Sequence, residues 1–142
     1  MSKNKFNLSV ILLVSMIFTS CIGSVVYERK LTAGYELSAN DHISGMSIYT
    51  TDEQYQIGIV NATVFAVGYN KNFIIVKQHP FEGNSVNKAI TNYFIIPIKN
   101  DGNLPPDKNK IGPLTYHDFL KKRNELGISN DLNFTITIDE LQ

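Results

Sequence analysis

The sequence predicts an α+β fold: a mostly antiparallel β-sheet of five to seven strands, with one α-helix at about residues 115–126 before the last strand. Two β-rich runs flank the turn residues 69–72 and indicate a hairpin over residues 63–78. A helix-capping pattern begins at Thr115. After the helix, apolar and polar residues alternate strictly over residues 132–139, which is typical of a half-exposed antiparallel strand.

The composition fits one β-rich domain and argues against two kinds of site. The 142 residues include 7 Tyr and 8 Phe, and aromatic and β-branched residues favour strands. The 13 basic and 13 acidic residues balance, so the chain as a whole has no basic footprint for nucleic acid. The single cysteine, Cys21, forms neither an internal disulfide nor a thiolate metal site by itself.

The first 20 residues have the three parts of a secretory signal. Lys3 and Lys5 form the positive start, residues 8–18 form the apolar segment, and the small residues Thr19 and Ser20 follow. A helix through the apolar segment reaches only about 18 Å, whereas the hydrocarbon core of a bilayer is about 30 Å thick. We therefore expect a cleaved signal rather than a transmembrane anchor.

The residues that precede Cys21 resemble a bacterial lipobox. Phe18-Thr19-Ser20 supplies one hydrophobic and two small residues, with Phe18 in place of the usual Leu. The resemblance implies a lipid on the Cys21 sulfur, cleavage before Cys21 and acylation of its new amine. Several acyl chains on one residue give stable anchoring, which a single chain does not. Ile22 follows instead of Asp, which in Gram-negative lipoproteins suggests the outer membrane, facing the periplasm or the surface.

This signal sets the expected organisation of the chain. Residues 1–20 form a lipoprotein signal peptide, residues 21–34 form the lipidated N-terminus and a tether, and residues 35–142 form one globular domain. Within the tether, residues 25–27 have the composition of a first strand.

Short strands are expected at residues 35–37, 46–51 and 56–60, separated by polar turns. In the hairpin, the turn contains asparagines, which tolerate the positive φ angles of such turns. Residues 73–76 are all apolar, so both faces of this strand should be covered, as in the centre of a sheet.

Residues 91–100 form the next expected strand. Pro97 cannot donate a ladder hydrogen bond, so we expect this strand at a sheet edge, or its end at a bulge. Long polar connections lie on either side of it, over residues 79–90 and 100–113, and loops of this length tend to be functional.

The predicted helix has an apolar stripe that also contains one arginine. Asp118 completes the capping pattern, and Gly127 lies just past the helix end. Arg123 has two interpretations: a packed stem with its charged head in solvent, or a buried ion-pair partner or ligand clamp. The apolar residues of the stripe are Tyr116, Phe119, Leu120 and Leu126.

No catalytic or metal-binding motif stands out. The histidines His42, His79 and His117 have no metal-ligand spacing, and the first two neighbour turn residues, where a solvated side chain is expected. The acidic pairs at 52–53 and 139–140 are adjacent in sequence, so their side chains face opposite ways on a strand. Nucleophile-elbow, P-loop and dinucleotide-binding patterns do not occur. We expect no cofactor, no metal and no enzymatic activity.

Three stretches are similar to a family of small bacterial lipoproteins and secreted proteins classed as a domain of unknown function. They are the hairpin ending NFIIVKQ, the strand YFIIPIK and the helix within GPLTYHDFLKKRNELGI. Members share a lipobox, a GY…FIIVKQ-like hairpin and a GPLT…F…R…LG helix, and the similarity runs from Tyr35 to about Phe134. Pro97 departs from the acidic residue that the family pattern has there. The resemblance implies a fold and a location rather than a reaction.

We therefore expect a cell-envelope lipoprotein that binds another envelope macromolecule, a protein or a cell-wall component, and that holds the membrane through lipid on Cys21. An inhibitor or immunity protein is one form of such a module. Tyr69, Phe81 and Arg123 are the candidate contact residues. Two other classes fit the same residues: a structural or accessory subunit of an envelope complex, and a hydrolase or small-ligand carrier with a site assembled from distant residues.

Overall fold

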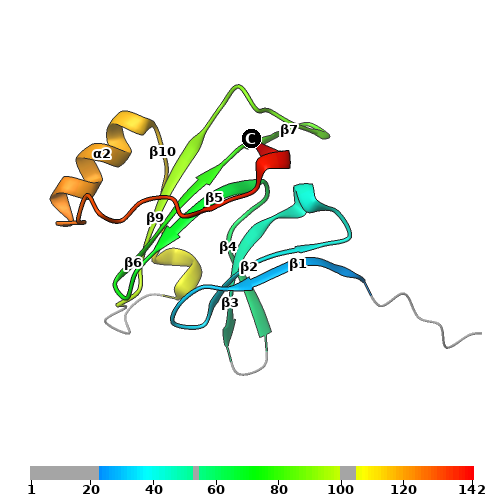
Figure 1. Cartoon of the computed structure of the whole chain (residues 1–142), viewed down its shortest axis with the longest axis horizontal. Helices are drawn as coiled ribbons and strands as arrows, with labels where there is room; N and C mark the ends of the chain where they lie inside the picture. The colour runs from blue at the N-terminus through cyan, green and yellow to red at the C-terminus, as the bar shows by residue number, and fades with distance from the viewer. Residues whose placement is uncertain (1–22, 53–54, 100–104) are drawn as a thin grey trace, which may run out of the picture.

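The computed structural model describes residues 23–52, 55–99 and 105–142. They form a four-stranded sheet, a five-stranded sheet, a small two-stranded hairpin and one α-helix (Figure 1). All strand pairs are antiparallel. The predicted α+β class is confirmed, and the described residues contain 11 strands, several of them only two residues long.

The four-stranded sheet is built from consecutive strands joined by turns. It begins with residues that we expected in the tether, since its first strand starts four positions after Cys21. The expected strands near residues 35, 46 and 56 are all present. In spatial order the strands are β1 (Val25–Lys30), β2 (Tyr35–Asn40), β3 (Ser47–Asp52) and β4 (Tyr55–Val60), with a short 3-10 helix, η2 (Ile43–Gly45), between β2 and β3.

The five-stranded sheet contains the predicted hairpin. Asn70 makes its turn, since the side-chain oxygen accepts hydrogen bonds from the N–H groups of Asn72 (2.8 Å) and Phe73 (2.9 Å). The strands, in spatial order, are β10 (Ile111–Leu114), β9 (Asn92–Pro97), β6 (Phe73–Gln78), β5 (Val64–Tyr69) and β11 (Ile136–Thr137). The apolar run of β6 therefore lies in the middle of the sheet, as predicted.

Pro97 led us to expect a strand at a sheet edge, or a bulge at the strand end. The edge is wrong, because β9 lies between β6 and β10. The pairing with β6 has no bulge there either, since its register runs without a shift up to Pro97, opposite Phe73. Pro97 is the last residue of β9, and β10 pairs only with Tyr93 and Ile95. The next amide, that of Ile98, donates to the carbonyl of Asn72, directly before β6 (2.8 Å). Successive residues of a strand direct their backbone groups to opposite neighbours, so the nitrogen of Pro97 faces β10. The paired part of β10 ends opposite Ile95. The missing N–H of Pro97 therefore removes no hydrogen bond between β9 and β10.

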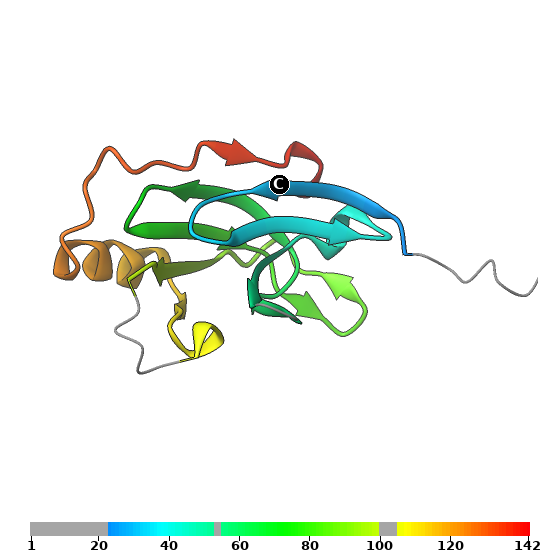
Figure 2. The same ribbon diagram turned by 90° about the horizontal axis from the view of Figure 1, so that it is seen from below.

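Two apolar cores lie on the two faces of the five-stranded sheet (Figure 2). Ile74 and Val76 of β6 face the four-stranded sheet, whereas Ile75 faces Phe119 of the helix α2 (Tyr116–Glu125). All four side chains are fully buried, and burial of one such side chain contributes about 1.5–3 kcal/mol. This double burial is the physical reason for the unbroken apolar run in β6.

The helix α2 covers β9 and β10 with a narrower face than its sequence predicts. Its capping pattern is present, because the Thr115 hydroxyl accepts from the Asp118 N–H at 3.2 Å. Phe119 is buried, but Tyr116 and Leu120 are exposed, so the predicted stripe is wrong for these two residues. The helix lies over β10, the strand at the edge of the five-stranded sheet, so the sheet covers only part of its surface. Within the described residues, no helix has the length and apolar character needed to cross a membrane.

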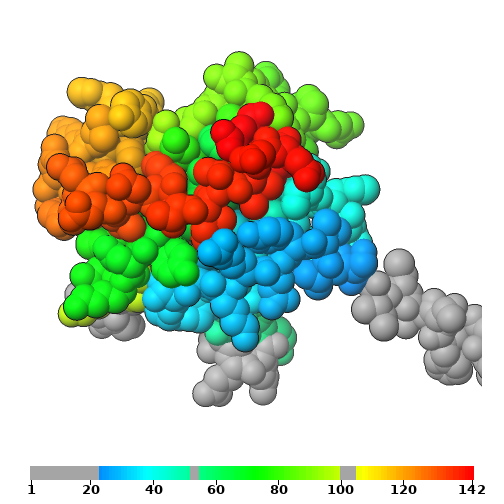
Figure 3. Space-filling model, in the orientation of Figure 1, coloured from blue at the N-terminus to red at the C-terminus, as the bar shows by residue number. Residues whose placement is uncertain are grey.

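After α2, residues 128–142 cross the molecule as a continuous band, orange to red in Figure 3. The predicted alternation of burial is confirmed: Leu132 and Ile136 are buried, Phe134 and Ile138 are half-buried, and the residues between them are exposed. The strand expected over residues 132–139 is shorter than predicted, because only Ile136–Thr137 pair with β5, as β11. The band lies directly on Gly68 of β5, where a Cβ atom in place of the glycine hydrogen would be 2.0 Å from the Asn133 carbonyl oxygen. The chain then ends in the 3-10 helix η4 (Asp139–Leu141).

The two long connections carry small elements. The first contains the hairpin of β7 (Phe81–Glu82) and β8 (Ser85–Val86), and the second contains the 3-10 helix η3 (Pro106–Lys108). Lys88 of the first connection donates to the carbonyls of Glu140 (3.2 Å) and Gln142 (2.7 Å). This lysine fastens the last residues of the chain to the connection before β9.

Candidate functional site

The three predicted contact residues lie on separate elements. Tyr69 ends β5 and is half-buried against the core between the sheets, Phe81 is exposed on β7, and Arg123 is buried in α2. Tyr69 pairs with Ile74 near the start of β6, whereas Phe81 follows the end of β6 at Gln78, so the two residues lie toward opposite ends of this strand. The structure does not bring these three residues together.

The Arg123 side chain binds backbone carbonyl groups of the same chain. Its Nη2 donates to the carbonyl oxygens of Ser129 (2.7 Å) and Leu132 (2.9 Å), and its guanidinium lies 5.6 Å from the centre of the Phe119 ring. The interpretation with the charged head in solvent is wrong, because the residue is buried. Each hydrogen bond to a charged group contributes about 1.5–3 kcal/mol, so Arg123 fixes the band that follows α2 and offers little surface to a partner.

His79 is buried, so the prediction of a solvated loop histidine is wrong for it. Its ring stacks on Phe65 with the ring centres 4.1 Å apart, and its Nδ1 lies 2.7 Å from the Ile90 carbonyl oxygen. A carbonyl only accepts, so Nδ1 carries the proton. His79 thus ties the connection before β9 to β5. Among the residues that the structure describes, no three His, Cys, Asp or Glu side chains gather as metal ligands.

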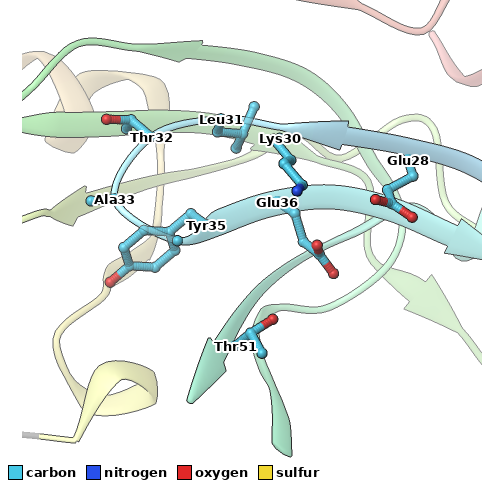
Figure 4. Close-up of a pocket in the computed structure, with 9 residues that line it drawn as sticks. Glu28, Lys30, Leu31, Thr32, Ala33, Tyr35, Glu36 and Thr51 are labelled. Carbon is cyan, nitrogen blue, oxygen red and sulfur yellow. The ribbon is translucent and has the colours of Figure 1, made fainter. Parts of the chain in front are cut away.

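An open hollow of about 530 Å³ lies at the β1–β2 hairpin (Figure 4). We call it the hairpin hollow. The Glu36 side chain points toward Thr51 of β3 (Figure 4). The residues that line it are Glu28, Lys30, Leu31, Thr32, Ala33, Gly34, Tyr35, Glu36 and Thr51.

The hairpin hollow has charges of both signs on one face of the sheet. The register places Lys30 directly opposite Glu36, with Glu28 diagonal to Glu36, at a backbone separation of about 7–8 Å. Tyr35 also lines the hollow, and burial raises the pKa of its hydroxyl. These groups are suited to hold a small polar ligand, and the two carboxylates are of the type used in acid–base chemistry.

A second hollow, of about 410 Å³, lies between the end of the first long connection and the start of α2. We call it the α2 groove. None of the residues that line it is charged, and the side chains of Tyr116 and Ile90 are 58% and 48% exposed. Leu120, also exposed, follows Tyr116 by one helical turn. The lining residues are Ala89, Ile90, Thr91, Asn92, Tyr93, Pro113, Leu114, Thr115 and Tyr116.

Two tyrosine rings, those of Tyr93 and Tyr116, line the α2 groove. The ring centres of Tyr93 and Tyr116 are 5.4 Å apart, and Tyr93 also packs on Phe119 at 5.0 Å. Burial, and to a lesser extent the neighbouring Tyr116, raises the pKa of Tyr93. A tyrosine hydroxyl is already neutral at pH 7, and the raised pKa keeps that of Tyr93 neutral at higher pH. A rigid, uncharged aromatic surface is typical of the centre of a protein–protein interface.

The sequence did not reveal the α2 groove. Ile90 and Tyr116 are far apart in the chain, and the Tyr116–Leu120 spacing predicts a buried helix face as readily as an exposed one. Cys21, the predicted lipid site, and the signal peptide lie outside the described residues. The acidic pair at 52–53 is only partly within them.

Comparison with protein families identifies the family of this chain. The model of a family described as "Protein of unknown function (DUF3997)" matches residues 32–141, from the β1–β2 turn to the last 3-10 helix. No curated protein and no solved structure matches the chain.

Proposed function

We propose that this chain, which belongs to the DUF3997 family of proteins of unknown function, is a lipid-anchored protein of the bacterial cell envelope. The support is in the sequence: a charged start, an apolar segment too short to span a bilayer, and a lipobox-like triplet before Cys21. Ile22 in place of Asp favours the outer membrane.

We further propose that the domain binds another envelope protein and catalyses no reaction. The α2 groove is the observation that carries this proposal. Tyr116 and Ile90 expose large apolar side chains at this uncharged hollow, and Leu120, one helical turn from Tyr116, is also exposed. A group of exposed apolar side chains supports a binding surface. The fitting partner presents an apolar side chain within an uncharged segment, because a charge buried against the uncharged lining would lose its hydration. A cell-wall hydrolase or toxin as partner would make the protein an inhibitor or immunity protein.

The hairpin hollow favours a second candidate, a small-ligand carrier or hydrolase. Glu28, Lys30 and Glu36 face one space and are suited to bind a polar ligand with charges of both signs. A structural role in an envelope complex, the remaining alternative, would use the α2 groove as its contact with the neighbouring subunit. Loss of the complex upon deletion, with unchanged sensitivity to added toxins or lysozyme, distinguishes that role from an inhibitor.

Photo-crosslinking from Tyr116 tests the binding proposal. A benzophenone amino acid in place of Tyr116 should capture an envelope protein in living cells, because Tyr116 lines the groove and is exposed to solvent. The matched control is the same replacement at Tyr55 of β4, whose side chain is 73% exposed on the other sheet. Capture of the same proteins with the same yield from both positions, or of none from Tyr116, would refute the proposal.

Substitution of Tyr116 tests how much this side chain contributes to the affinity for the partner. Tyr116→Asp should weaken binding of the captured partner by roughly 30-fold or more, since a central interface tyrosine contributes about 2 kcal/mol and a carboxylate in the groove is unfavourable. Tyr55→Asp should leave the affinity unchanged. Calorimetry with the purified partner measures both values.

A further inference from the structure

We infer that the end of the domain that carries the first strand rests on the lipid bilayer, through Val25 and Val26 of β1 and Phe81 of β7. This contact adds an orientation to the proposed lipid anchor, and it rests on lipid attachment at Cys21. The surface that the domain meets is the headgroup layer of a lipid membrane.

The distance between the lipid and the sheet is short. Val25 follows Cys21 by four residues, and an extended chain spans at most about 3.6 Å per residue, so their Cα atoms are at most about 14 Å apart. The headgroup layer of one leaflet takes up roughly 5–7 Å of that length, from the difference between total and hydrocarbon thickness. The Cα atom of Val25 therefore lies at most about 7–9 Å above the headgroup layer.

The start of β1 exposes two apolar side chains in a row. Val25 and Val26 are 56% and 47% exposed, and the pairing with β2 shifts register between Val25 and Tyr27. Among the described strands, β1 lies at the edge of its sheet and pairs with β2. The backbone there is held in place, because Asp41 after β2 donates its N–H to the Ser24 carbonyl at 3.0 Å. The valines are thus part of a rigid edge and not of a free tail.

The β7–β8 hairpin projects to the same end of the molecule as the start of β1 in two perpendicular views (Figures 1 and 2). It carries the exposed ring of Phe81. The β5–β6 turn, with Lys71, lies at the opposite end in both views. A plane that touches the start of β1 and the β7–β8 hairpin would leave the α2 groove and Lys71 off the membrane.

The chemistry of this end suits a neutral membrane surface. Two acidic residues lie beside the contacts, because Asp41 donates its N–H to the Ser24 carbonyl and Glu82 follows Phe81, so we expect no gain from anionic lipids. The attraction comes from apolar burial at the headgroup boundary. Because lipid on Cys21 makes this contact intramolecular, even a weak attraction orients the domain.

Depth-dependent fluorescence quenching tests the inference. The lipidated full-length protein, with a bimane label on Val26→Cys, Phe81→Cys or Lys71→Cys, is placed in phosphatidylcholine vesicles that carry nitroxide on their headgroups. We expect at least threefold stronger quenching at positions 26 and 81 than at position 71, unchanged by added salt.

Each other outcome has a defined meaning. Equal quenching at all three positions, or none at position 26 in vesicle-bound protein, overturns the inference and leaves lipid attachment intact. Quenching at position 26 without position 81 removes Phe81 from the contact and overturns the inferred orientation. A chain that carries no lipid on Cys21 overturns the proposed anchoring and this inference together.

Discussion

Replacement of Gly68 by alanine is expected to destabilise the domain by about 3 kcal/mol or more, the upper end for overpacking. The added Cβ would lie 2.0 Å from the Asn133 carbonyl oxygen and 3.2 Å from Cγ1 of Ile75. The carbonyl belongs to the backbone, which a rotamer change cannot move. The band cannot shift cheaply, because Thr135 donates to the Val67 carbonyl (3.1 Å) and Arg123 holds the Leu132 carbonyl.

Thermal unfolding of the soluble domain measures this effect. A loss of about 3 kcal/mol lowers the midpoint by roughly 12–24 °C for a domain of about 100 residues. Gly58→Ala in β4 is the matched control, because its nearest neighbour would be Cε1 of Tyr49 at an ordinary 3.9 Å. That variant should stay within about 0.5 kcal/mol of the parent. Equal midpoints for the two variants would mean that residues 132–135 do not lie on β5.

Replacement of Cys21 by alanine is expected to abolish fatty-acid labelling and to release the mature domain from the membrane fraction. Without the sulfur there is no attachment point, and the described part of the domain has no helix that could hold the bilayer instead. Labelling with a radioactive fatty acid and fractionation of cells measure the two effects.

Ser20→Ala is the control for this variant, because it keeps a small residue before the cysteine and should remain labelled and membrane-bound. A Cys21→Ala chain that has lost residues 1–20 but stays with the membrane would contradict the anchor. The length of the recovered chain shows whether the signal has been removed.

The sequence predicts the elements whose signals are local. The hairpin needs only its turn asparagine and two β-rich runs, and α2 needs only its cap. The burial of β6 on both faces follows from its four consecutive apolar residues. These features depend on neighbours in the chain, and the structure confirms them.

Features that depend on which elements meet were not predictable. Pro97 indicated a strand at the sheet edge. The missing N–H of Pro97 breaks a hydrogen bond only if the neighbouring strand is paired at that position, and the pairing of β10 ends opposite Ile95. His79 follows a strand and precedes a proline, yet its burial depends on Phe65 and Ile90 from other segments. Arg123 is buried because the later band brings two carbonyl oxygens to it. The α2 groove has the same origin, since Ile90 and Tyr116 meet only in the folded chain.

The most direct test of the proposed lipid anchor is the mass of the N-terminal peptide from protein extracted from bacterial membranes. The anchor predicts a peptide that begins at Cys21, with lipid on its sulfur and an acyl chain on its amine. A peptide that begins elsewhere, or one that contains Cys21 as a free thiol, would contradict it.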